Sequence, residues 1–409
     1  MKLSVLRTID RVAGILICKI LSLFGKLFPG EPLGGPPQKI LVILLSEMGS
    51  LVLAYPMFQR LQEKYPEATV SVLLFEKNRE MLEILGVAAA QNILTIDDRS
   101  LGNFARDSLL ALYKMRKQGF DAVIDCELFA RVSSIFSYLS GASIRSGFAP
   151  YTQEGLYRGS FINRPVLYNP YQHISRQYLT LVEAFESNSL PMAKRIPQND
   201  RLEVPNFNPD SRQVNDLIAR FEKDFPVCRN RNLILVYPSG GILPIRAWPL
   251  EHYCKLVSAL LERGYVVGMI GLKSDKPFAE SIIRHCKHPD AIDLTGYTRS
   301  IRELMMLFYR AALLITNDGG PGQFAAMTPI PTIIFFGPES PALYGSHSPN
   351  AHFYFSGLSC SPCLTAYNHR NSPCDGDNLC LKQVDPEQVL KKAAEMIEKY
   401  SKSAHNHKI

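Results

Sequence analysis

Short apolar runs rich in β-branched residues recur along the chain in two groups. The first group begins with Lys39–Leu45 and the second with Leu233–Tyr237. Runs of this length are typical of strands buried on both faces of a parallel sheet. We expect strands at Lys39–Leu45, Thr69–Phe75, Asn92–Ile96 and Ala122–Asp125, and then at Leu233–Tyr237, Val266–Ile270, Ile292–Leu294, Leu313–Thr316 and Thr332–Phe336.

Amphipathic stretches of helical period fill the intervals between these runs. Strands that alternate with helices indicate an α/β fold with parallel sheets. Residues 126–200 show no clear pattern. The expected helices are Leu51–Tyr65, Asn78–Leu85, Leu101–Lys117, Glu251–Glu262, Pro277–Cys286, Ile301–Arg310, Gly322–Ala326 and residues 386–400.

The alternation stops and restarts, which predicts two Rossmann-like domains facing a cleft. The stretch from Gln198 to Pro209 is polar and contains two prolines, so we place the domain boundary there. Ligands of such sheets bind outside the carboxyl ends of the strands. The predicted parts are an N-terminal helix (1–30), a first domain (31–200), a second domain (201–385), and a C-terminal helix with its tail (386–409).

The N-terminal residues 3–28 form an amphipathic helical pattern. The five Lys and Arg residues of the stretch 1–29, against Asp10, account for +4 of the formal net charge of +7 of the whole chain. An apolar face beside basic residues is typical of a helix that lies in the interface of an anionic membrane. The apolar side holds Val5, Ile9, Val12, Leu16, Ile20, Leu23, Phe24 and Leu27, and the polar side holds Ser4, Arg7, Arg11, Lys19, Ser22 and Lys26.

Three other interpretations of this segment compete with the membrane interface. Lys19 interrupts the apolar core that a signal peptide needs, and Phe28-Pro29-Gly30 is a poor cleavage site. A transmembrane helix would place Arg11 or Lys19 in hydrocarbon at about 3 kcal/mol each. The third alternative is a helix docked on the protein itself or on a second subunit.

Three loops at strand ends of the second domain carry candidate donor-binding residues. Asp318, Gly319, Gly320 and Pro321 lie between a buried strand and a helix, where free N–H groups favour an anion such as a diphosphate. The alternative is a tight turn whose glycines serve steric needs alone. The other candidates are Ser239, Gly240 and Arg246 after the strand Leu233–Tyr237, where arginine suits phosphate, and Asp275 after the strand Val266–Ile270, whose carboxylate suits ribose hydroxyls. Together they predict a nucleoside diphosphate site.

The corresponding loop of the first domain is Ser46-Glu47-Met48-Gly49-Ser50. Glu47 follows the first strand and is the best local candidate for a general base. The alternative is a solvated glutamate at a helix start. We assign Ser46, Gly49 and Ser50 to the acceptor side of the predicted cleft.

These motifs resemble glycosyltransferase family 9, the lipopolysaccharide heptosyltransferases and their relatives. The resemblance rests on Lys39-Ile-Leu-Val-Ile43 with Ser46-Glu-Met-Gly-Ser50, Trp248-Pro-Leu-Glu-His-Tyr253, Asn317-Asp-Gly-Gly-Pro321 with Phe324-Ala-Ala326, and Phe335-Phe-Gly-Pro338. It implies a GT-B fold and an inverting transfer from a nucleotide-activated sugar, with no metal required for catalysis.

The resemblance also assigns roles to single positions. Asp318, Gly319 and Gly320 match the donor-binding loop, Asp275 matches an acid that contacts the donor ribose, and Arg246 stands where the family usually has lysine. Two positions depart from the family. Ser50 stands where the family has its proposed aspartate base, and Gln323 replaces a histidine. Serine is a weak base without help. We therefore assign the base to Glu47, with Arg246 stabilising the leaving group.

A cluster of four cysteines follows the second domain's strands. Cys360, Cys363, Cys374 and Cys380 have the spacing C-x2-C-x10-C-x5-C, which suits a tetrahedral structural zinc ion. Two disulfides, an iron–sulfur cluster and four reduced thiols are the alternatives.

The predicted function is glycosyl transfer from a nucleotide sugar to a lipid-linked saccharide, such as a lipopolysaccharide core. The predicted place is the cytoplasm, on the inner face of the bacterial inner membrane. The alternative is a catalytically impaired nucleotide-sugar-binding protein that acts as an assembly partner, which Ser50 motivates. Nucleic acid is not an expected partner, because charge outside the N-terminal segment is nearly balanced.

Overall fold

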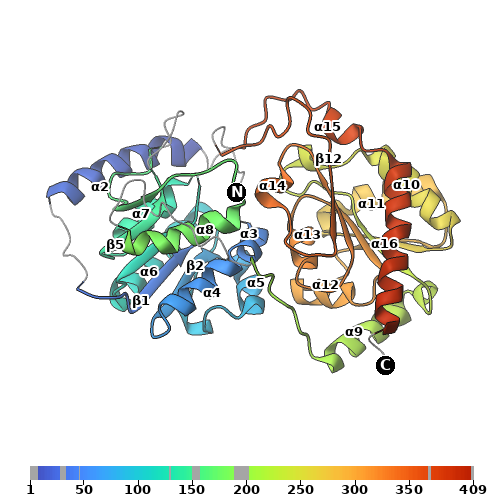
Figure 1. The fold of residues 1–409 in the computed structure, drawn as a ribbon, viewed down its shortest axis with the longest axis horizontal. Coiled ribbons are helices and arrows are strands. Elements are labelled where there is room, and N and C mark those ends of the chain that lie inside the picture. Colours follow the sequence, from blue (N-terminus) through green and yellow to red (C-terminus); the bar gives the residue numbers. More distant parts are fainter. Residues whose placement is uncertain are drawn as a thin grey trace. The chain divides into compact units, whose positions relative to one another are not determined.

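The structure is a computed structural model that describes residues 8–27, 34–45, 47–128, 130–149, 157–187, 202–366 and 370–406. The chain forms two compact units (Figure 1). Unit 1 runs to Glu203 and includes Thr365–Arg370, and unit 2 comprises Val204–Leu364 and the chain from Asn371. The sequence predicts residues 365–370 as part of the second domain, whereas Arg370 groups with unit 1.

Unit 1 is built on a parallel sheet of six strands in the order β3-β2-β1-β4-β5-β6. The predictions of β1 to β4 are confirmed, with β2 and β4 correct to the residue. Strands β5 and β6 lie in the stretch that showed no pattern. The bounds are β1 Lys39–Ile43, β2 Thr69–Phe75, β3 Ile93–Ile96, β4 Ala122–Asp125, β5 Ile144–Phe148 and β6 Arg164–Val166.

The helices of unit 1 bury the two faces of this sheet. The helix predicted from Leu51 to Tyr65 is two helices, and the first begins at Met48, inside the predicted loop. Helices α6 and α7 cover one face with a core that includes Leu41, Met115 and Phe136. The bounds are α3 Met48–Leu53, α4 Tyr55–Lys64, α5 Arg79–Leu85, α6 Leu101–Gln118, α7 Arg131–Leu139 and α8 Ile174–Glu183.

The N-terminal helical prediction is confirmed from residue 8 onward. A π-helical turn η1 (Asp10–Gly14) leads into α2 (Ile15–Leu27), and both pack on α7. Ser4, Val5 and Arg7 lie outside the described residues. Among the helices of the described ranges, none is long and apolar enough to cross a membrane.

Unit 2 is built on a second parallel sheet of six strands, in the order β12-β11-β10-β7-β8-β9. The five predicted strands are confirmed, and the edge strand β12 was missed. The bounds are β7 Leu233–Tyr237, β8 Val266–Gly271, β9 Ala291–Thr295, β10 Leu313–Asn317, β11 Thr332–Phe336 and β12 Ala351–Phe355.

The core of unit 2 extends from its sheet to the C-terminal helix. Trp248 and Val389 belong to one buried cluster, so the C-terminal helix is part of unit 2 rather than a separate element. The bounds are α9 Ser211–Asp224, α10 Leu250–Glu262, α11 Lys276–Cys286, α12 Ile301–Phe308, α13 Gly320–Ala325, α14 Pro341–Tyr344, α15 Leu379–Lys382 and α16 Pro386–Asn406.

Candidate active site

Asn317, the last residue of β10, ties the predicted donor loop to the sheet of unit 2. Its side-chain oxygen accepts hydrogen bonds from the backbone N–H of Trp248 at 2.9 Å and from the hydroxyl of Tyr253 at 3.0 Å. Its amide nitrogen donates to the carbonyl of Ser239 at 3.0 Å. All four residues are buried. The loop from Tyr237 to Pro249 is therefore fixed from within rather than free to move over the sheet.

Trp248 anchors the far end of the same loop. Its ring stacks on Phe335 with a centroid separation of 4.5 Å, and its indole N–H donates to the carbonyl of Val384 at 3.1 Å. A buried tryptophan that satisfies its N–H contributes both area and orientation. This contact fixes the backbone two residues after Arg246.

Arg246 lies between two carboxylates in the short helical turn η6 (Pro244–Arg246). Its Nη2 donates to Oε1 of Glu339 at 2.6 Å, and its Nε lies 3.7 Å from Oδ2 of Asp318. The side chains of Arg246, Glu339 and Asp318 are 12%, 3% and 9% exposed. The structure thus brings together two predicted residues, Arg246 and Asp318, with a third that we missed. Glu339 follows β11 directly after the Gly337-Pro338 motif, so the strand-end rule could have found it.

The glycines of the donor loops differ in what they do. A Cβ on Gly240 would lie 2.7 Å from the carbonyl oxygen of Leu243, so the turn requires glycine there. Around Gly319 no atom lies within 4 Å of such a Cβ, which leaves room for a ligand to approach the backbone. Helix α13 begins at Gly320 rather than at the predicted Gly322, and it has only six residues with Pro321 in its first turn.

Asp275 and Gln323 are both buried, and the side chain of each forms a hydrogen bond with a backbone group. Oδ2 of Asp275 accepts a hydrogen bond from the N–H of Leu272 at 2.8 Å, within the turn η7 (Lys273–Asp275). Nε2 of Gln323 donates to the carbonyl of Tyr344 at 2.8 Å. Asp275 therefore shapes the end of β8, and its contact with a ribose stays a prediction.

In unit 1, Glu47 precedes α3 with a φ of 64°, in the left-handed region that residues with a Cβ rarely adopt. Its carboxylate forms an ion pair with Arg370, which belongs to the same unit. Gly49 and Ser50 lie in the first turn of α3, and Ser46 is outside the described residues. The sequence had suggested no role for Arg370.

Glu127 is a second carboxylate near the end of β1. Its Oε1 accepts a hydrogen bond from the backbone N–H of Leu45 at 2.8 Å. Two residues earlier in the chain, Asp125 at the end of β4 forms a buried ion pair with Arg158. Glu127 follows the strand Ala122–Asp125, so the strand-end rule could have identified it too.

The four clustered cysteines lie in unit 2, on both sides of the segment that belongs to unit 1. The backbone N–H of Cys363 donates to the carbonyl of Pro338 at 2.9 Å. Burial raises the pKa of the Cys380 thiol, and the charges of Cys363, Cys360 and Cys374 raise that pKa further. Within the described ranges, no group of three or more His, Cys, Asp or Glu side chains could hold a metal ion. The four thiols are therefore not grouped as a closed zinc site, and zinc stays a prediction.

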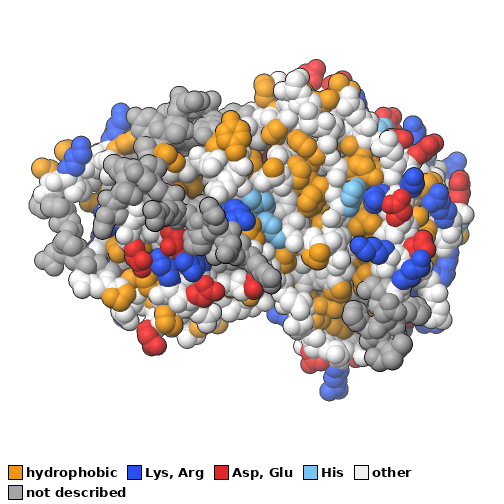
Figure 2. Space-filling view, in the orientation of Figure 1, with side chains coloured by type: hydrophobic (Ala, Val, Ile, Leu, Met, Phe, Trp, Pro, Cys, Tyr) orange, Lys and Arg blue, Asp and Glu red, His pale blue; other side chains and the backbone are white. Residues whose placement is uncertain are grey.

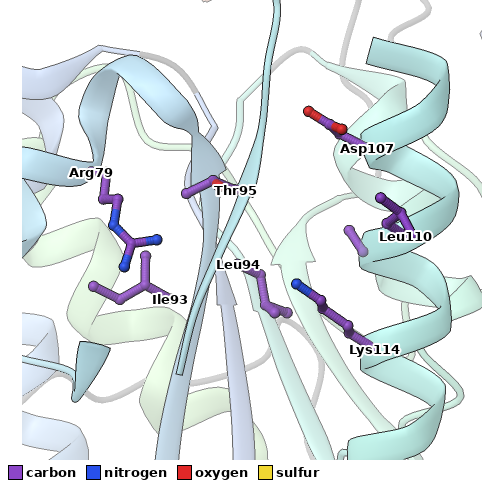
Figure 3. A pocket seen from close by; sticks show the side chains of 8 residues that line it. Arg79, Ile93, Leu94, Thr95, Asp107, Leu110 and Lys114 are labelled. Atoms are coloured by element: carbon purple, nitrogen blue, oxygen red, sulfur yellow. The ribbon is translucent and has the colours of Figure 1, made fainter. Parts of the chain in front are cut away.

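Unit 1 also has a polar pocket beside its edge strand β3, but no predicted site residue reaches it (Figure 3). The figure shows side chains from β3 and α6 pointing into it. The lining residues are Arg79, Ile93, Leu94, Thr95, Asp107, Leu110, Ala111 and Lys114.

Comparison with known proteins gives a consistent assignment. Residues 111–372 match glycosyltransferase family 9 (heptosyltransferase). The chain is 24% identical over 316 residues to lipooligosaccharide heptosyltransferase 2 of Haemophilus influenzae, which covers 74% of this chain and 84% of that protein.

Solved structures share the fold. The structure of E. coli ADP-heptose LPS heptosyltransferase II superposes with a TM-score of 0.70 at 19% identity, over 89% of this chain and 99% of that one. The iron-containing dodecameric glycosyltransferase TibC of enterotoxigenic E. coli H10407 gives a TM-score of 0.52 at 12% identity, over 89% and 79%.

Two six-stranded parallel sheets of this topology define a GT-B fold. The chain belongs to glycosyltransferase family 9.

Proposed function

We propose that the protein transfers heptose from ADP-heptose to a lipid-linked saccharide of the lipopolysaccharide core or a related cell-surface glycan. The names of the relatives support the sugar and the pathway, and the E. coli heptosyltransferase II structure supports the nucleotide. The observation that carries the proposal is the buried cluster of Arg246, Asp318 and Glu339 at the strand ends of unit 2.

Unit 2 binds the donor in this proposal. Arg246 donates a hydrogen bond to Glu339 and lies beside the carboxylate of Asp318. These two carboxylates hold the guanidinium in one orientation, and its positive charge suits the phosphates of the donor. The guanidinium stabilises the diphosphate as it leaves. Gly319 and Gly320 let the backbone approach the donor, Ser239 and Gly240 line the neighbouring loop, and Asp275 accepts from ribose hydroxyls.

Unit 1 supplies the base. An acceptor hydroxyl oxygen bonds to the anomeric carbon from the side opposite the diphosphate, so the configuration inverts. The bond from that carbon to the diphosphate oxygen breaks, and the hydroxyl proton passes to the Glu47 carboxylate. Arg370 places a positive charge beside Glu47 and orients it. Ser50, Gly49 and Ser46 form the acceptor loop. No metal ion takes part in this step, as the family resemblance implies.

A lipid-linked acceptor is confined to a membrane, whereas a nucleotide sugar is soluble in water. We therefore place the enzyme in the cytoplasm, as a peripheral protein on the inner face of the bacterial inner membrane. The basic amphipathic helix α2 supports this placement.

Release of ADP from ADP-heptose by the full chain, with and without a lipid-linked acceptor, tests the proposal. We expect acceptor-dependent release that EDTA does not diminish. If the protein releases the nucleotide from none of the nucleotide sugars tested, although ADP raises its melting temperature, the binding-protein alternative is favoured.

The same assay tests the base. Glu47→Gln should lower kcat by about 100-fold or more while the affinity for ADP stays unchanged. Glu127→Gln is the matched variant, because Glu127 is the other carboxylate beside the end of β1. Full turnover by Glu47→Gln combined with loss in Glu127→Gln would move the base to Glu127.

A further inference from the structure

Helix α2 and the turn η1 pack on α7 through a seam of small residues. A Cβ on Gly14 would lie 3.0 Å from the Cβ of Arg131, and one on Gly25 would lie 3.3 Å from the ring of Tyr138. Larger residues at these positions would push the helices apart. The seam consists of Gly14, Cys18, Ser22 and Gly25.

Hydrogen bonds fix the seam at both ends. Oδ1 of Asp10 accepts from the backbone N–H groups of Arg131 and Val132 at 2.9 and 3.0 Å. These are the first residues of α7, so Asp10 caps a helix that lies far along the chain. At the other end, the hydroxyl of Ser22 accepts from the Tyr157 hydroxyl at 2.7 Å and from the N–H of Ser160 at 3.0 Å.

The face opposite the seam is apolar and exposed. At 3.6 residues per turn, Leu16, Ile20 and Leu23 lie on the side of α2 away from Cys18. A helix on a protein surface ordinarily turns its large apolar residues inward, and this one turns them outward. The large apolar residues of this face are Ile9, Val12, Leu16, Ile17, Ile20, Leu23, Phe24 and Leu27, and each is 40% to 69% exposed.

Basic side chains border this face. Arg11, Lys19 and Lys26 are exposed, and none of them forms an ion pair with another described residue. Figure 1 shows α2 along the outer edge of unit 1, and Figure 2 shows hydrophobic and basic side chains next to one another along that edge.

We infer that the outer face of α2 is a membrane-binding surface for anionic phospholipid, and that α2 stays clamped to α7 while it binds. The large apolar side chains enter the acyl boundary, and the three basic residues meet the phosphates. Lysine is depleted in the buried centre of protein interfaces, so the chemistry of this face favours lipid over a second copy of the chain.

The packing of α2 on α7 distinguishes this surface from a flexible tether. Because α7 follows β4 and packs on the sheet, a bilayer that holds α2 also fixes the orientation of unit 1. The inference deepens the proposed function and rests on its lipid-linked acceptor. Unit 1, which carries the candidate base, would meet this acceptor at a fixed depth relative to the membrane surface.

Vesicle flotation of the full chain tests the surface. We expect the protein to float with vesicles of phosphatidylethanolamine and phosphatidylglycerol, and to float less with phosphatidylcholine alone or at high salt. Leu16→Glu/Leu23→Glu should weaken binding at least about tenfold. Leu109→Glu/Leu110→Glu is the matched control, because it adds the same charge at two exposed leucines of α6.

Equal loss in both variants, or no loss in the α2 variant, would overturn the surface assignment. So would a lipid-free dimer that Leu16→Glu/Leu23→Glu converts to a monomer, because the face would then be a subunit interface. The melting shift produced by ADP should be the same in wild type and both variants. If vesicle binding behaves as expected but no sugar is transferred, the proposed function fails and the membrane surface remains.

The reactivity of Cys18 tests whether α2 stays packed on α7. Cys18 is fully buried in the seam, so a maleimide should leave it unmodified on vesicles as in solution, and should modify it once urea has unfolded the protein. Peptide mapping by mass spectrometry gives the readout. Modification of Cys18 only in the presence of vesicles would show that α2 leaves α7, and would overturn the clamped arrangement.

Discussion

Asn317 is the residue whose loss should separate the donor loop from the sheet of unit 2. Replacing it by leucine keeps nearly the same size but removes its hydrogen bonds. The N–H of Trp248 and the carbonyl of Ser239 then lose a buried partner. Tyr253 keeps its hydroxyl bond to the carbonyl of Tyr237 at 3.2 Å.

The magnitude follows from the two groups left without a partner. Each buried polar group without a hydrogen bond costs roughly 1–3 kcal/mol, so Asn317→Leu should lower the free energy of unfolding of unit 2 by about 3 kcal/mol. Thr332→Val is the matched control. Thr332 is also buried in unit 2, but its hydroxyl makes a single bond, to the carbonyl of Ile330 at 3.2 Å, so its loss should cost about 1 kcal/mol.

The chain's single tryptophan supplies the assay. Trp248 lies in the core of unit 2, so its fluorescence during urea denaturation follows the unfolding of that unit. Titration with ADP should also show weaker binding by Asn317→Leu than by Thr332→Val, because only the first change loosens the loop that carries Arg246. Equal costs for the two variants, or an unchanged ADP affinity, would refute the argument that Asn317 holds the donor loop.

Three further changes test other parts of the structure. Arg246→Met should weaken ADP binding at least about tenfold in calorimetry, whereas Arg246→Lys, which keeps the charge, should stay closer to wild type. Arg158→Met leaves Asp125 buried without its ion-pair partner, and should lower the free energy of unfolding of unit 1 by about 3–5 kcal/mol in urea denaturation. Elemental analysis of the purified protein should find about one zinc per chain, bound by the clustered cysteines. Cys363→Ser should then reduce that content, and equal metal in both proteins would refute the site.

The strands were predictable because the apolar pattern of each run identifies it as a buried strand without information from the rest of the chain. Runs such as Leu233–Tyr237 are apolar at nearly every position, since both faces of a parallel sheet are covered. Residues 126–200 gave no such signal. In α7, Ser133, Ser134 and Ser137 are fully buried, because the seam of α2 and the Asp125 ion pair need small or polar partners. A helix whose buried face consists of serines shows no apolar face in its sequence pattern, so the pattern did not predict it.

The candidate site was predictable only where it follows a strand. Arg246 and Asp318 meet because β7 and β10 are neighbours in the sheet. Glu339 follows the same rule and was overlooked. Arg370 could not be found in this way, because its contact with Glu47 spans 323 positions of the chain. Contacts of that kind depend on the tertiary path, not on spacing.

The orientation of the N-terminal helix was half predictable. Periodicity gave the apolar face, and that face is exposed as a membrane-interface helix requires. The docked face was hidden because glycine, cysteine and serine carry little hydrophobic signal. Docking on the protein and an exposed apolar face are both true of α2, although the sequence had set them as alternatives.

Mass spectrometry of a lipid-linked acceptor after incubation with ADP-heptose and the full chain tests the proposed sugar transfer most directly. We expect the acceptor to gain one heptosyl group and an equal amount of ADP to be released. An acceptor of unchanged mass, from a protein that still binds ADP, would contradict it.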